Sequence, residues 1–115
     1  MSFDVAVVAA EPGADEPAAR ELIERCYDRR PHIEGELDGR IVAFYQELRA
    51  IYPDHPPYDD DTPWACAPLD TGIDHVFMNL RHSADVAVIE AIQRLATEHG
   101  LVLYDPQGDA VYLPA

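Results

Sequence analysis

The stretch IDHVFMNLRHSADVAVIEAIQRLATEHG, from Ile73 to Gly100, decides the fold because it joins a clearly patterned strand to a clearly patterned helix. Its first part, from Ile73 to His82, alternates apolar residues with polar or aromatic ones, which is typical of a strand with one buried face. The residues that we expect to face the core are Val76, Met78 and Leu80. The alternation therefore predicts a strand over 73–82.

The second part of this stretch has the spacing of an amphipathic helix. Ser83 is a suitable N-cap residue with Asp85 in the first turn, and Gly100 follows the last apolar position as a stop signal. We expect the buried face of this helix to consist of Val86, Ile89, Ile92, Leu95 and Ala96.

The chain beyond Gly100 is predicted to form a β-hairpin. Leu101–Tyr104 and Ala110–Leu113 are short runs of residues that favour strands. The residues between them, from Asp105 to Asp109, include a proline and a glycine, which suit a tight turn. The two runs should therefore pair with each other.

The N-terminal half contributes one strand and two helices. Phe3–Val8 alternates like a strand. A helix is expected from an N-cap at Asp15 up to Pro31, and a second one from about Leu37 to Tyr52. The apolar stripe of the first of these helices consists of Ala19, Leu22, Ile23, Cys26 and Tyr27.

A stretch rich in proline and aspartate, from Tyr52 to Pro68, is expected to form a long loop. The segment from Trp64 to Leu69 supplies a candidate for one further strand, which would pair with the strand that begins at Ile73. Because Pro68 has no N–H group to donate, we expect this strand at an edge of the sheet.

The predicted order of elements is βααββαββ, which indicates the α+β class and a single domain over residues 1–115. This order is close to that of a ferredoxin-like two-layer sandwich with an inserted helix and an extra terminal strand. We expect the helices to cover one face of a mostly antiparallel sheet. The opposite face, too apolar for ordinary solvated surface, would then carry Ala6, Val8, His75, Phe77, Asn79, Arg81, Val102, Tyr104 and Tyr112.

The chain is strongly acidic. Its 115 residues include 22 acidic residues against 8 basic ones, all of which are arginine, and the formal charge is −14. Such a surface repels phosphate groups, which excludes a general nucleic-acid binder. No segment approaches the roughly 18 to 20 apolar residues of a membrane-spanning helix, so we expect no membrane partner.

The cysteines and histidines match no known kind of site. Cys26 and Cys66 are too few for a disulfide scaffold or a metal tetrad, and a reduced, cytoplasmic setting fits them best. The five histidines do not show the spacing of a zinc motif. Phosphate-binding glycine loops and nucleophile elbows are missing as well. We therefore expect inert thiols, and no metal, cofactor or catalytic residue.

The densest charge lies at Asp59, Asp60 and Asp61. Their contiguous spacing differs from that of a calcium loop, in which ligands alternate with other residues. We expect a solvated loop or, as a functional role, an electrostatic contact with a partner rich in arginine or lysine. Tryptophan is enriched among binding hot spots, and the nearby Trp64 is therefore either an interface anchor or a plug at the rim of the core.

The uncovered sheet face supplies His75, Phe77 and Arg81 as further candidates for partner binding. Three roles stay open for this face. It binds a protein partner, it pairs with a second copy of the chain, or it forms a ligand-binding or catalytic pocket in which Asn79 and Tyr104 join His75 and Arg81.

The sequence HGLVLYDPQ, from His99 to Gln107, and the single Trp64 resemble a family of small bacterial proteins of uncharacterised function. The resemblance extends loosely to an N-terminal strand, a central stretch rich in proline and acidic residues, and a final helix. Some members of this family look like components of toxin and immunity loci. The resemblance therefore implies a binding role, and it assigns no catalytic residue.

Charge and resemblance together predict a non-catalytic binding protein of the cytoplasm. The expected partner is a basic protein, such as a nuclease toxin that an immunity protein neutralises, because a net charge of −14 attracts a cationic surface. The alternative is a small enzyme or ligand-binding domain that uses the open sheet face.

Overall fold

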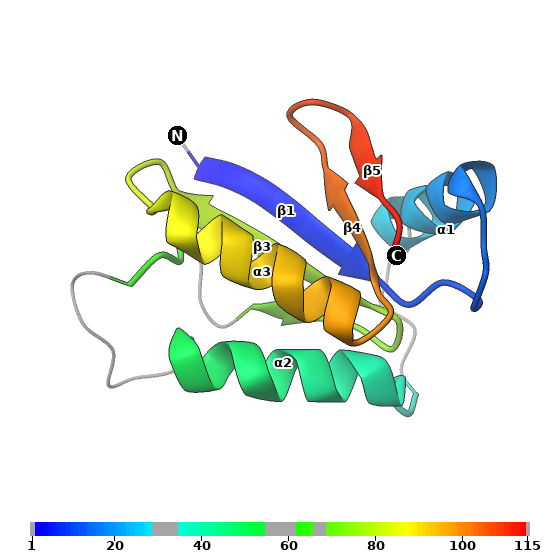
Figure 1. Ribbon diagram of the computed structural model, residues 1–115, viewed down its shortest axis with the longest axis horizontal. Coiled ribbons are helices and arrows are strands. Elements are labelled where there is room, and N and C mark those ends of the chain that lie inside the picture. Colours follow the sequence, from blue (N-terminus) through cyan, green and yellow to red (C-terminus); the bar gives the residue numbers. More distant parts are fainter. Residues whose placement is uncertain (1, 29–34, 55–61, 66–68, 115) are drawn as a thin grey trace.

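The computed structural model describes residues 2–28, 35–54, 62–65 and 69–114 (Figure 1). Within these residues the chain forms three helices and one five-stranded sheet. In chain order the elements are β1 (Ser2–Val8), α1 (Glu16–Asp28), α2 (Gly39–Ile51), β2 (Asp70–Thr71), β3 (His75–Arg81), α3 (Val86–Glu98), β4 (Val102–Asp105) and β5 (Ala110–Tyr112). The predicted α+β class is confirmed.

The sheet has the order β2-β3-β1-β4-β5, and each neighbouring pair is antiparallel. The long strands β1 and β3 pair along their whole length, from Ser2 opposite Arg81 to Val8 opposite His75. The C-terminal hairpin, formed by β4 and β5, adds to the other side of β1. The strands predicted at 3–8, 73–82, 101–104 and 110–113 are therefore all present, within one or two residues.

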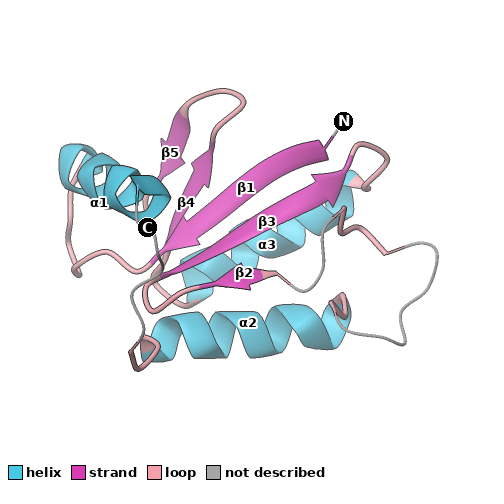
Figure 2. Cartoon of the chain, turned by 180° about the vertical axis from the view of Figure 1, so that it is seen from behind, coloured by secondary structure: helices cyan, strands magenta, loops and turns pink. Residues whose placement is uncertain are grey.

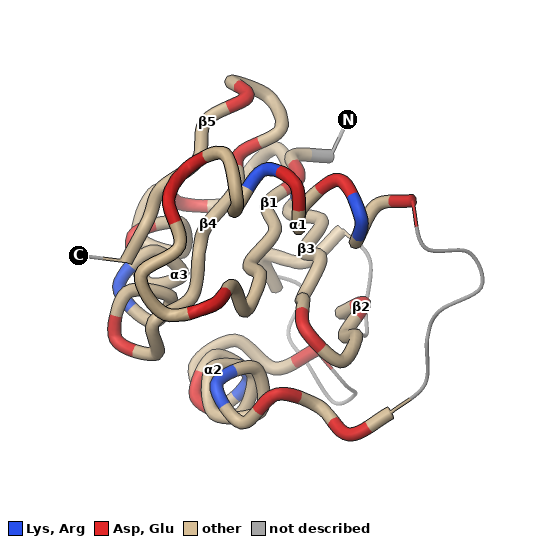
Figure 3. The backbone as a smooth tube through the Cα atoms, turned by 90° about the vertical axis from the view of Figure 1, so that its right-hand side faces the viewer, with Lys and Arg blue, Asp and Glu red and all other residues tan. Residues whose placement is uncertain are grey.

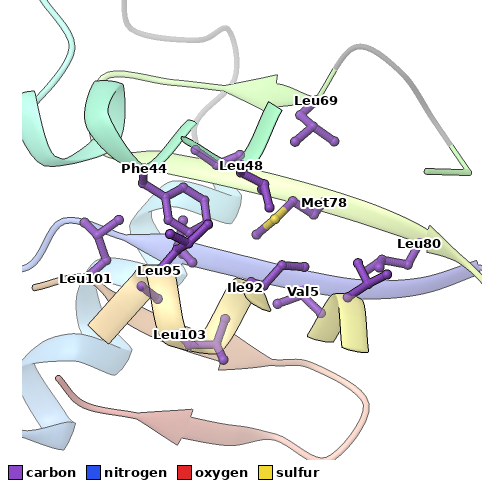
Figure 4. Packing of buried hydrophobic residues seen from close by; sticks show 14 of the residues in the cluster. Val5, Phe44, Leu48, Leu69, Met78, Leu80, Ile92, Leu95, Leu101 and Leu103 are labelled. Carbon is purple, nitrogen blue, oxygen red and sulfur yellow. The ribbon is translucent and has the colours of Figure 1, made fainter. Parts of the chain in front are cut away.

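The helices α2 and α3 lie side by side against one face of the sheet, and the larger hydrophobic core lies between them and the strands (Figures 1 and 4). The strands contribute the alternating residues that the sequence predicted, including Met78 and Leu80 from β3. Phe44 and Leu48 of α2 and Ile92 of α3 pack onto them and are fully buried. This part of the molecule has two layers.

The expectation that all helices cover one face is wrong for α1. Its stripe of Ala19, Leu22, Ile23 and Cys26 packs with Val8 and Val102, whose side chains point to the face opposite the larger core. Figure 2 shows α3 behind the strands and α2 below them, whereas α1 lies apart from both, beside β4 and β5. That face is apolar because α1 covers part of it and forms a second, smaller core with it.

Tyr112 was expected on that same face, and this prediction is also wrong. In the β4–β5 pair, Tyr112 lies opposite Leu103, which belongs to the larger core. Residues directly opposite each other in an antiparallel pair share a face, and a shift of one residue exchanges the faces. Val111 is therefore the residue of β5 that packs with α1 and Val102.

Aspartates define the helix starts. Asp15 directly precedes α1, and its carboxylate accepts a hydrogen bond from the Ala18 backbone N–H, as predicted. Asp38 caps α2 by accepting from Arg40 N–H. The cap of α3 is Asp85, which accepts from Ala87 N–H, so the prediction of Ser83 as the N-cap is wrong by two residues. Both residue types cap helices well, and the local sequence does not separate them.

The predicted edge strand at 64–69 is only partly correct. The edge strand is β2, at Asp70–Thr71, and it pairs with β3. Trp64 forms an isolated antiparallel bridge with Leu80, flanked by the bond from Ala65 N–H to the carbonyl oxygen of Asn79. The chain thus meets the edge of β3 at two places. Residues 66–68, and residues 55–61 of the predicted loop, lie outside the described part.

Candidate functional site

One group of aromatic and polar side chains lies on the sheet face beside α1, where the helix leaves part of the strands uncovered. We call this group the aromatic face, and it consists of Asp4, Tyr27, Phe77, Asn79, Arg81 and Tyr104. The ring of Tyr27 stacks on that of Phe77, with 4.6 Å between centroids, and meets the Tyr104 ring edge-on at 6.3 Å. Tyr27 is 40% exposed, so the stacked rings reach solvent.

Charged and polar groups border these rings. Asn79 donates a side-chain hydrogen bond to the Asp4 carboxylate across the β1–β3 pair. The Tyr104 hydroxyl donates to Asp109 at 3.0 Å, and Arg20 of α1 donates to the same carboxylate at 2.9 Å. The bond from Arg20, with that from Tyr104, lowers the pKa of Asp109, which keeps the carboxylate ionised. Burial raises the pKa of Tyr27 to about 12, which keeps its phenol neutral.

The structure separates the residues that the sequence proposed for partner binding. Asp59, Asp60 and Asp61 lie outside the described residues. Phe77 is partly buried within the aromatic face, and Arg81 is exposed at the end of β3.

His75 lies at the other end of β3 from Arg81 and is only 1% exposed. Six residues of strand place the two backbones about 20 Å apart. The alternative of a small enzyme required His75 and Arg81 to surround one pocket. At this separation they do not.

Trp64 is a plug of the core. It is 2% exposed, belongs to the larger hydrophobic cluster, and donates its indole N–H to the carbonyl oxygen of Tyr52 at 3.0 Å. Of the two roles that the sequence left open, the structure supports the structural one. A side chain so deeply buried offers no surface to a partner.

A buried carboxylate organises the chain next to Trp64. Asp54 is 1% exposed, accepts hydrogen bonds from the Tyr45 hydroxyl and the Leu69 N–H, and lies 4.0 Å from the Arg49 guanidinium. These contacts join the end of α2 to the segment that leads into β2. Buried carboxylates are retained where donors satisfy them in this way.

We expect the ionisation of the Tyr45 phenol to make the stability of this cluster depend on pH at high pH. Burial, and then the hydrogen bond to Asp54, raise the pKa of Tyr45 from 10.0 to about 12. Because the folded state holds this proton more tightly, the stabilisation is complete below pH 10 and is lost as the pH rises through 12. Wild type should therefore lose more of its free energy of unfolding than Tyr45→Phe over that interval. Urea titrations of both proteins at several pH values measure the difference, and parallel curves would contradict it.

Several residues of the segment from His99 to Gln107, which the sequence analysis singled out, have structural roles. Gly100 ends α3 with φ of 66°, and the bond from Leu101 N–H to the carbonyl oxygen of Ala96 closes the helix. The Gln107 side chain donates to the carbonyl oxygen of Asp4 at 2.8 Å and accepts from its N–H at 2.7 Å. This amide thus extends the sheet where the hairpin turns. The segment fixes the hairpin against β1.

A second group, which the sequence analysis missed, lies beneath α1. The Cys26 sulfur is 3.6 Å from the Asp74 Oδ1 atom, and the His75 Nδ1 atom is 3.1 Å from the same oxygen. Cys26 was expected to be an inert thiol, because no activating histidine or lysine is evident near it in sequence. Cys26 meets the neighbouring residues Asp74 and His75 because the last turn of α1 lies near the start of β3.

None of the helices in the described ranges is both long and apolar enough to cross a membrane. Comparison with protein-family models, with curated proteins and with solved structures finds no significant match to this chain. The functional argument therefore depends on the residues and contacts themselves.

Proposed function

We propose that this chain is an acidic binding protein of the cytoplasm that engages a basic protein, as an immunity protein neutralises a toxin. The observation that carries the proposal is the charge of −14, with 22 acidic residues against 8 arginines. Figure 3 shows the acidic positions spread over helices, strands and connecting segments. Such a field accelerates encounter with a cationic partner and disfavours nucleic acid.

The aromatic face is the surface we propose for the contact. Exposed tyrosine is enriched in binding hot spots, and the faces of aromatic rings attract the side chains of arginine and lysine. Tyr27 offers an exposed ring that Phe77 and Tyr104 hold in place. Asp4 and Asp109 provide carboxylates at its border. The chemistry therefore fits a partner that presents arginine or lysine side chains.

We also propose that β1 to β4, with α2 and α3, form a ferredoxin-like core. The order β2-β3-β1-β4 supports this, because β1 and β2 run parallel to each other with β3 between them. In this interpretation α1 and β5 are additions to that core. Both additions border the aromatic face, because Arg20 of α1 and Asp109, which directly precedes β5, bond to each other next to Tyr104.

The experiment is an affinity capture at low ionic strength, followed by kinetics with the protein that elutes at high ionic strength. The association rate should fall by about tenfold or more between about 10 mM and about 1 M salt, as the screening length shrinks from about 30 to about 3 Å. Tyr27→Ala should weaken binding by about tenfold or more. Ile51→Ala is the matched control, because Ile51 is 48% exposed on α2.

Three outcomes would contradict the proposal. An association rate that does not change with salt would exclude electrostatic steering. Equal loss of affinity in Tyr27→Ala and Ile51→Ala would exclude the aromatic face. Light scattering over a range of concentrations tests whether the face instead pairs with a second copy of the chain, and a dimer that Tyr27→Ala dissociates would replace the proposed partner.

A further inference from the structure

Three side chains that commonly bind metal ions converge beneath α1. They are Cys26 from the last turn of that helix, Asp74 from the turn before β3, and His75 at the start of β3. One ligand atom from each lies within 4.8 Å of the others. Cys26 and His75 are buried at 2% and 1% exposure, whereas the Asp74 side chain is 19% exposed. The cluster thus has a buried side and one side that reaches solvent.

Packing holds the imidazole of this cluster in place. Phe77 stacks on the His75 ring, with 4.4 Å between centroids. On another side, Gly72 approaches so closely that a Cβ atom built there would lie 2.2 Å from the ring carbon Cε1. A ring confined between Phe77 and Gly72 keeps its Nδ1 atom directed at Asp74. A metal site needs ligands whose orientations are fixed in this way.

Two of the three ligand-atom spacings are close to those around a tetrahedral zinc ion. Ordinary zinc bond lengths place a sulfur and an oxygen ligand about 3.6 Å apart, and a nitrogen and an oxygen ligand about 3.4 Å apart. The corresponding distances here are 3.6 Å from Cys26 Sγ to Asp74 Oδ1 and 3.1 Å from His75 Nδ1 to Asp74 Oδ1. An ion would therefore enter with small side-chain movements, in place of the protons that these atoms share.

A groove of about 350 Å³ leads to the cluster. Asp74 lines it together with Leu22 and Arg25 of α1, and Glu11 and Glu21 also contribute to the wall. An ion can reach the carboxylate from this side, and a water molecule in the groove can supply the fourth ligand. The two glutamates favour the approach of a cation.

We propose that Cys26, Asp74 and His75 form a binding site for a zinc ion, with the fourth position open to the groove. Thiolate and imidazole select zinc over calcium and magnesium, which prefer oxygen ligands. The ion would add a link between α1 and the sheet. Hydrogen bonds and the smaller core already connect the two. It would bind only to the folded chain and would stabilise it. This site is independent of the proposed partner.

The test uses the full chain with Cys66→Ser as the background, so that Cys26 is the only thiol. Titration with Co²⁺, a spectroscopic substitute for zinc, should give one equivalent of a tetrahedral spectrum with a thiolate charge-transfer band, and Zn²⁺ should abolish it. Zinc should also raise the melting temperature. Cys26→Ser should remove the charge-transfer band, and His75→Gln should weaken binding by about tenfold or more.

The second cluster of potential ligands, Glu47, Glu98 and His99, provides the matched control. His99→Gln should leave the cobalt spectrum and the zinc affinity unchanged. Loss of binding in His99→Gln, a spectrum without thiolate character, or no zinc effect on the melting temperature would each overturn the proposed site. Circular dichroism of every variant verifies folding, and Asp74→Asn, which keeps the shape of the side chain, tests the site again if His75→Gln does not fold.

Discussion

Trp64→Ala should lower the free energy of unfolding by about 3 to 5 kcal/mol, the usual cost of removing a large aromatic side chain from a core. Trp64 is 2% exposed and packs within the larger cluster, and its indole holds the carbonyl oxygen of Tyr52. A small domain is stable by only about 5 to 15 kcal/mol, so this loss leaves the protein close to unfolding. Chemical denaturation monitored by circular dichroism measures the change, because the signal does not depend on the tryptophan itself.

Trp64→Phe separates the two contributions of this side chain. It keeps most of the ring volume and loses the hydrogen bond to Tyr52, so we expect a smaller loss than in Trp64→Ala. Ile51→Ala, at an exposed position of α2, should change stability by well under 1 kcal/mol. If Trp64→Ala folds with nearly unchanged stability but no longer binds the partner, the side chain is an interface anchor and its assignment to the core is wrong.

Gly72→Ala should cost about 3 kcal/mol, at the upper end of the range for overpacking. The added Cβ atom would lie 2.2 Å from Cε1 of His75 and 2.7 Å from each ring nitrogen. The ring cannot move aside easily because Phe77 stacks on it. The substitution should therefore displace the imidazole or the turn before β3, and thermal and denaturant unfolding would report the loss.

A double variant identifies the cause of that loss. When His75→Ala removes the ring, the added methyl group of Gly72→Ala has space, and the two substitutions together should cost less than the sum of their separate effects. Gly39→Ala is the matched control, because its added Cβ has no atom within 4 Å apart from its chain neighbours and its own helix backbone, and alanine favours the helix. Additive effects of Gly72→Ala and His75→Ala would show that the clash with the ring is not responsible.

All elements except the short edge strand β2 were predictable, because each of them is determined by local periodicity. The strand over 75–81, the helix over 86–98 and the C-terminal hairpin follow from alternation, helical spacing and turn residues that lie within a few positions of one another. The exact N-cap residues were harder to predict. Ser83 and Asp85 are both good N-cap residues, and the tertiary position of the chain selects Asp85.

The candidate site was less predictable, because its residues meet across long sequence distances. Phe77 was named from its position on the strand, but Tyr27 was placed in a buried stripe, and the stacking of these rings depends on where α1 lies. The same position of α1 brings Cys26 to Asp74, which is 48 residues away. No local sequence pattern predicts a contact between residues so far apart in the chain.

By itself the sequence determined the acidic charge, the α+β class, the order of the elements and, in every strand except β5, the residues directed to the larger core. Charge is a sum over residues, and secondary structure follows from neighbouring residues, so neither needs knowledge of the whole chain. Only the tertiary structure decided that α1 packs on the opposite sheet face, that Trp64 is buried, and that Cys26 joins His75. An apolar stripe requires a helix to be covered but does not say by which surface, because hydrophobic burial has no direction.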